Sequence, residues 1–241
     1  MGREVAETRE EGLVGSRSRQ KVRTPGFLGV RYRRATGVSL PCPATRFLAK
    51  SLPIRAGEAF LDMGSGTGVV GIYAAERGAT VTAVDISAKA VAETVANARL
   101  NGVRVRAIRG DLFARVRGRF TRVAFNAPYV RLTRAGQEDK RTCDRTRVSR
   151  LRTVTTFLRQ LPTHLEDGGR GYLVLSSRSP VPLFEETADE AGLKWRTVRM
   201  WRTSEEQILL VCLRLARPRP YAAPSASRNG RSASKGRGAV P

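Results

Sequence analysis

Apolar residues along the chain recur with two alternating spacings, one typical of β-strands and the other of α-helices. From residue 59 to residue 192, short apolar runs predict strands, and each is followed by apolar residues three or four positions apart, which predict a helix. Gly78, Gly102 and Gly192 stand where the helical spacing stops. The strands predicted for one sheet are Ala59–Phe60, Thr80–Val84, Val103–Ala107, Val123–Phe125, Tyr172–Leu175, Trp195–Trp201 and Ile208–Leu213.

This order of elements favours an α/β fold of the Rossmann-like type. Strands that alternate with helices form a mostly parallel sheet with helices on both faces, because each crossover helix returns the chain to the same end of the sheet. Helices are expected around Leu48, Ile72, Val95, Leu158 and Phe184.

The two ends of the chain lack this periodicity. Residues 1–24 contain no regular apolar spacing and become basic from Arg17, so they predict a flexible arm. Residues 216–241 are rich in Pro, Ala, Ser, Gly and Arg and predict a disordered tail. The domain is therefore expected at 25–215, and its first ordered stretch, Phe27–Tyr32, is interpreted as one strand with a solvated face.

Composition adds a strong positive charge. The chain has 241 residues, 41% of them hydrophobic, which is enough for one α/β domain with a core. Its formal net charge of +23 favours a polyanionic partner such as nucleic acid or the ribosome, although arginine that merely fills solvated surface explains it equally well. Arginine and lysine are dense in the stretch 131–152.

Cysteine and histidine usage favours neither a disulfide framework nor a metal site. Cys42, Cys143 and Cys212 lie far apart, and His164 is the single histidine. The first residues are charged and no apolar stretch is long enough to span a bilayer, so a cytoplasmic protein without membrane contact is expected.

The glycine-rich stretch Leu61–Gly68 follows a predicted strand and precedes a predicted helix. Strand, glycine turn and helix bring backbone N–H groups close to a nucleotide-like ligand. Gly66–Gly71 also matches the G-x-G-x-x-G pattern of dinucleotide-binding proteins, which by itself is a weak signal.

The fuller pattern, Asp62-x-Gly64-x-Gly66-x-Gly68, resembles the first motif of class I methyltransferases, which use S-adenosylmethionine (SAM) and have a seven-stranded sheet. A carboxylate near the turn suits the ammonium and sulfonium charges of SAM. Asp85 ends the second strand and can accept hydrogen bonds from both ribose hydroxyls, and Asp111, after the third, can face the adenine amino group.

Asn126-Ala127-Pro128-Tyr129 ends the fourth predicted strand and resembles the N-P-P-Y motif of methyltransferases that modify a planar amino nitrogen. The Asn126 side-chain oxygen and the Ala127 carbonyl can each accept an N–H of the amine. Pro128 fixes the backbone, and Tyr129 offers a flat stacking surface. Ala127 departs from the motif, but its carbonyl is retained.

Several motifs together resemble the HemK/PrmC family of glutamine methyltransferases over residues 38–215. Pro41–Thr45 is similar to that family's P-x-P-E-T turn, with Ala44 in place of the acid, and Asn97–Gly102 and Gly110–Phe113 are similar to its core. The compact HemK2/Mtq2 branch, which methylates a release-factor glutamine together with a small partner subunit, is the most similar. The resemblance implies cofactor binding by Asp62, Gly64, Gly66, Gly68, Asp85, Asp111 and Asn126, and catalysis by Asn126, Pro128 and Tyr129.

The first hypothesis is therefore a SAM-dependent N-methyltransferase acting on a protein glutamine amide of release-factor type. An RNA or rRNA base N-methyltransferase is the main alternative, with the basic segments binding phosphates. A small-molecule methyltransferase and a SAM-fold binding protein without activity also stay open.

Overall fold

The computed structural model describes residues 26–33, 35–128 and 144–216, and of residues 144–148 it describes the backbone alone. The predicted arm at 1–24, the predicted tail beyond Ala216 and Tyr129 lie outside these residues, so the domain limits 25 and 215 stay a prediction.

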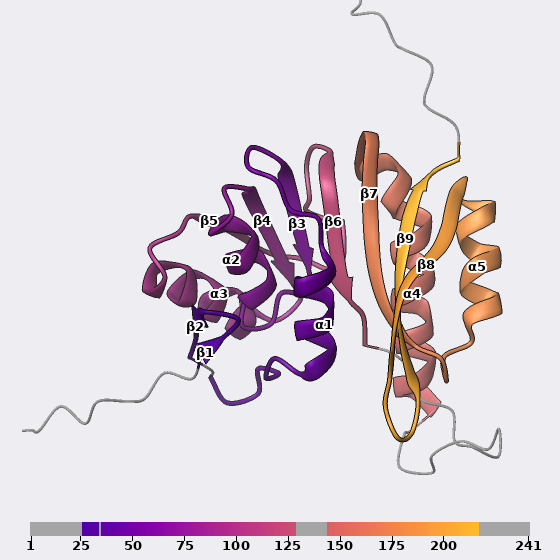
Figure 1. Ribbon diagram of the computed structural model, residues 1–241, viewed down its shortest axis with the longest axis horizontal. Coiled ribbons are helices and arrows are strands. Elements are labelled where there is room, and N and C mark those ends of the chain that lie inside the picture. The colour runs from indigo at the N-terminus through magenta and orange to yellow at the C-terminus, as the bar shows by residue number, and fades with distance from the viewer. Residues whose placement is uncertain (1–25, 34, 129–143, 217–241) are drawn as a thin grey trace, which may run out of the picture.

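The described residues form a seven-stranded sheet with the order β5-β4-β3-β6-β7-β9-β8 (Figure 1). The first five strands in this order are parallel, and β9 runs antiparallel to both β7 and β8. This confirms the predicted mostly parallel sheet. The strands are β3 (Ala59–Met63), β4 (Thr80–Asp85), β5 (Val105–Arg109), β6 (Phe120–Asn126), β7 (Leu165–Ser176), β8 (Leu193–Arg202) and β9 (Gln207–Leu215).

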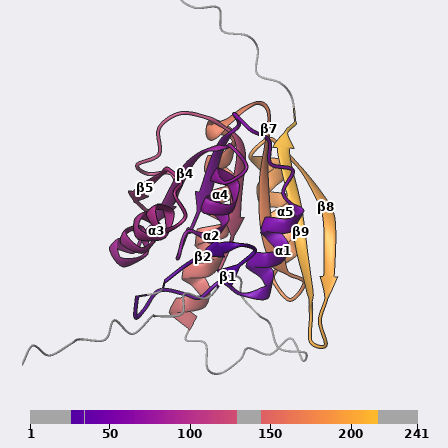
Figure 2. The ribbon, with the colours of Figure 1, turned by 60° about the vertical axis from the view of Figure 1, so that its left-hand side comes forward.

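Helices cover both faces of the sheet (Figures 1 and 2). One hydrophobic cluster joins α1, α2 and α3 to one face, and a second joins α4 and α5 to the other. In β3, β7 and β9 the two clusters use alternate residues, as the period of two in a strand requires. The helices are α1 (Pro43–Ser51), α2 (Val69–Ala75), α3 (Ala88–Leu100), α4 (Asp144–His164) and α5 (Val181–Glu190). No helix in the described ranges has both the length and the apolar character needed to cross a bilayer.

The single strand predicted at Phe27–Tyr32 is wrong. The segment forms a short antiparallel hairpin of β1 (Gly26–Phe27) and β2 (Val30–Arg31), turned at Leu28 and Gly29, whose φ angles are +56° and +88°. Left-handed φ values at two successive residues reverse the chain, and the apolar alternation continues across the turn and conceals it.

This hairpin is attached to α3 by two amide side chains one turn apart. Asn97 accepts from the Arg33 N–H at 2.8 Å and donates to the Arg33 carbonyl at 3.0 Å. Asn101 makes the same pair of bonds with Arg31, at 2.8 and 2.6 Å. Because each amide both donates and accepts, it pairs with an extended backbone as a neighbouring strand does.

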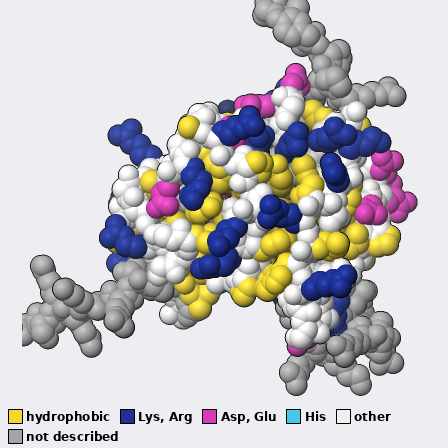
Figure 3. All heavy atoms as spheres, viewed as in Figure 1, with side chains coloured by type: hydrophobic (Ala, Val, Ile, Leu, Met, Phe, Trp, Pro, Cys, Tyr) yellow, Lys and Arg dark blue, Asp and Glu magenta, His cyan; other side chains and the backbone are white. Residues whose placement is uncertain are grey.

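The face of the molecule that carries α1, α2 and α3 is seen in space-filling form in Figure 3. Lysine and arginine side chains are spread over it, with hydrophobic atoms between them.

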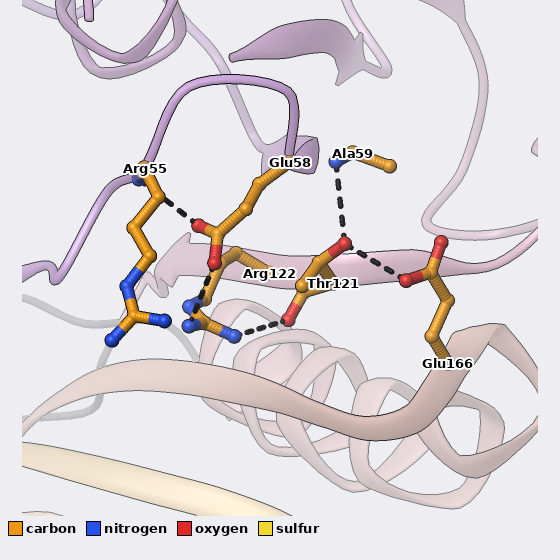
Figure 4. Close-up of polar contacts among 6 residues, drawn as sticks. All are labelled: Arg55, Glu58, Ala59, Thr121, Arg122 and Glu166. Carbon is orange, nitrogen blue, oxygen red and sulfur yellow. Dashed lines mark hydrogen bonds and ion pairs between the residues drawn. The ribbon is translucent and has the colours of Figure 1, made fainter.

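A polar network joins the amino ends of β3, β6 and β7 (Figure 4). Arg122 forms a salt bridge of 2.9 Å with Glu58, and both side chains are about nine-tenths buried. Thr121 accepts from the Ala59 N–H at 3.3 Å and donates to Glu166 at 2.8 Å. A buried charge needs a partner of opposite sign, so these contacts fix which strand ends lie together. The network lies at the amino ends of these strands. The glycine stretch follows β3 at the opposite, carboxyl ends.

Candidate functional site

A cavity of about 680 Å³ lies at the carboxyl ends of β3, β4 and β6. After β3 the chain adds β4 and β5 on one side of β3, and it then crosses over to place β6 on the other side of β3. The strand order therefore reverses between β3 and β6. Met63 pairs with Val84 and with Phe125, which puts Asp85 and Asn126 one residue beyond its two neighbours. Ligands of open parallel sheets bind in the crevice at such a point.

The glycine turn forms the floor of this cavity. Gly64, Gly66 and Gly68 have φ angles of +65°, +55° and +79°, which only glycine adopts without strain. A Cβ on Gly68 would lie 2.8 Å from Thr94 Cγ2. Thr94, on α3, is fully buried and bonds to the Gly66 carbonyl at 3.3 Å, so helix and turn hold each other in place.

Asp62 is buried below the turn and lines the cavity. Its carboxylate accepts the Gly71 N–H at 2.9 Å. Burial raises the pKa of Asp62 to about 7, the Gly71 hydrogen bond opposes this shift, and the nearby Asp85 charge adds to it. The ionised form of a carboxyl group with such a raised pKa is strongly stabilised by a cationic ligand, because the positive charge offsets the cost of burying the carboxylate.

Asp85 ends β4 with both carboxylate oxygens directed at backbone N–H groups. Gly66 donates to one oxygen and Ser87 to the other, each at 2.9 Å. Each carboxylate oxygen has two lone pairs, so each retains one acceptor site. The arrangement fits the predicted pair of hydrogen bonds from a diol.

Asn126 ends β6 with an amide whose two ends are in different surroundings. Its Nδ2 donates to Thr45 Oγ1 at 3.0 Å and contacts Cys42 Sγ at 3.9 Å. Its Oδ1 is buried and has no hydrogen-bond partner among the residues that the structure describes. Buried amide oxygens are almost always paired, so an unpaired one on a residue that lines a cavity marks an unsatisfied acceptor of the kind that a ligand N–H would satisfy.

The predicted site residues are not all brought together. Asp62, Gly64, Gly66, Asp85, Asn126 and Pro128 line the cavity, and Gly68 follows directly as the residue before α2. Asp111 is exposed and is not among the lining residues, so its predicted contact with adenine stays a prediction. Tyr129 lies outside the described residues.

Sequence reasoning did not assign three further residues of the cavity. Thr45 belongs to the recognised Pro41–Thr45 turn but received no role, and the structure bonds it to Asn126. Cys42 precedes α1; burial raises its thiol pKa, but hydrogen bonds from Thr45, Ala44 and Asn126 outweigh this and lower it overall. Arg150 of α4 brings a cation to the cavity from the basic stretch.

Metal ligands are not clustered in the part of the chain that the structure describes. No group of three or more His, Cys, Asp or Glu side chains is close enough there to hold an ion.

Comparison with known proteins links this cavity to methyltransferases. The model of the methyltransferase small domain family matches residues 42–188. A ribosomal RNA small subunit methyltransferase C of Chromohalobacter salexigens is 34% identical over 148 residues, which are 60% of this chain and 40% of that protein. A putative protein N5-glutamine methyltransferase of Methanocaldococcus jannaschii is 30% identical over 163 residues, 62% of this chain and 77% of the relative.

A solved structure shares the fold. The 16S rRNA N2 methyltransferase of Thermus thermophilus, in complex with AdoMet and guanosine, superposes with a TM-score of 0.57 at 20% identity. The match covers 76% of this chain and 48% of that one. The chain thus spans less than half of this structure and of the Chromohalobacter salexigens relative.

Proposed function

Since the chain belongs to the methyltransferase small domain family, we propose that its cavity transfers a methyl group from S-adenosylmethionine to a planar amino nitrogen. The observation that carries this proposal is the buried, unpaired Oδ1 of Asn126 beside an Nδ2 held by Thr45. The amide cannot turn over without losing that bond, so its oxygen remains the end offered to an acceptor N–H.

The residues at the end of β6 act by orienting the acceptor. An amino group that donates its N–H groups to Asn126 Oδ1 and to the Ala127 carbonyl has its lone pair directed away from both and into the cavity. The same two oxygens stabilise the positive charge that develops on the nitrogen. This mechanism needs no general base with a tuned pKa, and His164 is not among the residues that line the cavity.

The cofactor fits the residues at the other strand ends. S-adenosylmethionine, when bound, supplies an electrophilic methyl group on a cationic sulfur. Asp62 would face its positive charge, the turn Gly64–Gly68 would allow close backbone approach, and Asp85 would accept its ribose hydroxyls. Asp111 is proposed for the adenine.

Two acceptor classes follow from the relatives. A protein glutamine amide is supported by the Methanocaldococcus jannaschii relative, which this chain matches over 77% of its length. If glutamine is the acceptor, we propose that the substrate is a release-factor-like protein and that a small partner subunit takes part. An RNA base amine is supported by the ribosomal RNA methyltransferase relative and by the charge of +23. Both acceptors carry a planar nitrogen whose lone pair is delocalised.

Labelling with tritiated S-adenosylmethionine tests the proposal. The purified chain is incubated with total RNA and, in parallel, with total protein of a cell extract, and each product is hydrolysed to nucleosides or amino acids. We expect label on an amide or exocyclic nitrogen in one of the two fractions. Label on oxygen, carbon or sulfur, or none in either fraction while the cofactor is bound, would contradict it.

The affinity for S-adenosylmethionine is expected to depend on pH through Asp62. With its pKa raised to about 7 by burial, this group is mostly neutral at pH 6 and mostly ionised at pH 8. Affinity for a cation therefore rises with pH, roughly tenfold per unit below pH 6, and levels off above pH 7. Isothermal titration calorimetry between pH 5 and 8 measures this rise.

Asp62→Asn is the matched control, because the amide oxygen can still accept the Gly71 N–H. Its affinity should be independent of pH over this range. The free energy of unfolding of the parent should also fall as the pH rises from about 4 to 7, because the folded state retains a proton that the unfolded chain releases. The variant lacks this proton and should not show the fall. An affinity of the parent that does not change with pH would be evidence against a charge contact at Asp62.

A further inference from the structure

Among the described residues, α1 is the helix that packs on one side of β7 and β9. On the side of α1, the buried residues of β7 and β9 belong to the same hydrophobic cluster as α1, whereas α4 and α5 pack on the opposite side. On this side the buried Ile208, Leu210 and Cys212 of β9 belong to that cluster, and β8 is the edge strand of this face (Figure 1). Four arginines lie on it, and we call them the arginine face: Arg170, Arg196, Arg199 and Arg214.

The register of the strands places these side chains on one surface. Arg196 pairs with Cys212 and Arg199 with Leu210, both members of the α1-side cluster, so cross-strand partners share this face. Arg170 and Arg214 are two positions from Tyr172 and Cys212, and alternate residues of a strand point the same way. Arg170 and Arg214 lie one row from Arg196, and Arg199 lies one row from it on the other side. With about 4.8 Å between strands and roughly 7 Å between rows, the backbone positions of the four arginines span about 17 Å.

The strand register relates the position of Arg199 to that of Asn126. Arg199 pairs with Leu210, Leu210 with Val174, and Val174 with Asn126. Three strand spacings of about 4.8 Å put the two ends of this row roughly 14 Å apart on the same face of the sheet. Leu210 and Val174 are fully buried in the cluster that contains α1, so this row gives the separation of the two sites but is not itself an open path between them.

The arginine face is exposed and carries uncompensated charge. All four side chains are exposed, and none makes a salt bridge with another described residue. Lys194, in contrast, pairs with Asp189, and Arg122, opposite Arg170, is neutralised by Glu58. Like charges on adjacent strands destabilise a sheet, so this cluster costs folding energy that an anionic partner would recover.

An aromatic side chain connects the arginine face to α1. Trp201 lies two positions beyond Arg199, is 37% exposed, and contacts Phe47 of α1 with ring centroids 6.3 Å apart. The same helix carries Thr45, which holds Asn126. Cations next to an exposed ring are the elements with which proteins bind phosphates and stack bases of a single strand.

We propose that the arginine face binds single-stranded RNA, with phosphates on the arginines and a base on Trp201. A sheet surface that carries several exposed cations suits a repeating polyanion, and Figure 3 shows basic side chains spread over this side of the molecule. The binding itself does not depend on the proposed function. Only the idea that the bound RNA supplies the methyl acceptor rests on the proposed function.

The test measures binding of a fluorescein-labelled 20-nucleotide oligouridine RNA to the full chain by anisotropy, at 50 to 300 mM NaCl. The variant Arg196→Gln/Arg199→Gln/Arg214→Gln removes three proposed phosphate contacts. The slope of log affinity against log salt should become about 2 less steep, because each contact to a single strand contributes roughly 0.7. At 0.15 M salt this corresponds to a loss of affinity on the order of 50-fold.

The charge-matched control is Arg99→Gln/Arg104→Gln/Arg106→Gln, three exposed arginines of α3, β5 and the segment between them, at the other edge of the sheet. This variant loses the same net charge as the arginine-face variant. Because salt screens charges beyond about 8 Å, its loss of RNA affinity should be limited to roughly threefold. The same three face positions changed to lysine should retain the parent's salt slope, which separates loss of charge from loss of folding.

Three results would overturn the inference. Equal losses in both glutamine variants would mean that overall charge, and not this face, binds RNA. Unchanged RNA affinity in the face variant would remove the face as a binding surface. Unchanged RNA affinity with impaired methylation of a protein would assign the face to an acidic protein. RNA binding is measured without S-adenosylmethionine and needs no methyl transfer, so failure of the proposed reaction would not be mistaken for failure of binding.

Discussion

Replacing Asn126 with alanine is expected to lower kcat for methyl transfer by about 10²- to 10³-fold, the usual effect of removing one preorganised hydrogen-bonding group from an active site. The reason is the buried Oδ1, which the structure leaves without a partner and which we propose accepts the acceptor's N–H. The dissociation constant of S-adenosylmethionine should change little. Single-turnover methyl transfer and calorimetric binding on the same preparation measure the two effects separately.

Thr45→Val is the companion variant. It removes the oxygen that accepts from Asn126 Nδ2 but leaves the Asn126 oxygen in the cavity. Because the amide is then free to rotate, we expect a loss in kcat of about tenfold, the value of one hydrogen bond of about 1.4 kcal/mol. If Asn126→Ala transferred methyl groups at the parental rate, orientation of the acceptor by this amide would be wrong.

Replacing Asp85 with alanine is expected to weaken binding of S-adenosylmethionine by at least about 100-fold. Hydrogen bonds to a charged acceptor contribute roughly 1.5–3 kcal/mol each, and two from the ribose would together exceed about 3 kcal/mol. Asp85 also accepts from Gly66 and Ser87, so its loss loosens the glycine turn as well. Calorimetric titration gives the affinity, and thermal unfolding of the apo protein gives the cost to the fold.

Asp111→Ala is the control for this substitution. It removes a carboxylate that also follows a strand of the sheet, but an exposed one that is not among the cavity-lining residues. We expect a loss of tenfold or less, the value of a single ordinary hydrogen bond of about 1 kcal/mol. If the affinity of Asp85→Ala stayed within threefold of the parent's, the cofactor assignment would be contradicted. If Asp111→Ala lost more affinity than Asp85→Ala, the principal carboxylate contact would lie after β5 instead.

The local pattern of the sequence predicted much of this fold. Apolar runs and helical spacings depend on residues a few positions apart, so they located the seven strands of the main sheet and the helices between them. The same local reasoning failed at Phe27–Tyr32. The reversal at Leu28 and Gly29 leaves the apolar alternation intact, and the hairpin is stabilised by Asn97 and Asn101, nearly seventy residues away.

By itself the sequence determined the order of the elements and which polar residues lie at or next to the strand ends, Asp62, Asp85 and Asn126 among them, because both follow from local spacing. The tertiary structure alone decided that Thr45 bonds to the nitrogen of Asn126 and leaves its oxygen unpaired. It also decided that arginines of three strands share one face with that residue. Strand register and side-chain partners depend on contacts between distant segments, and no spacing along the chain encodes those contacts.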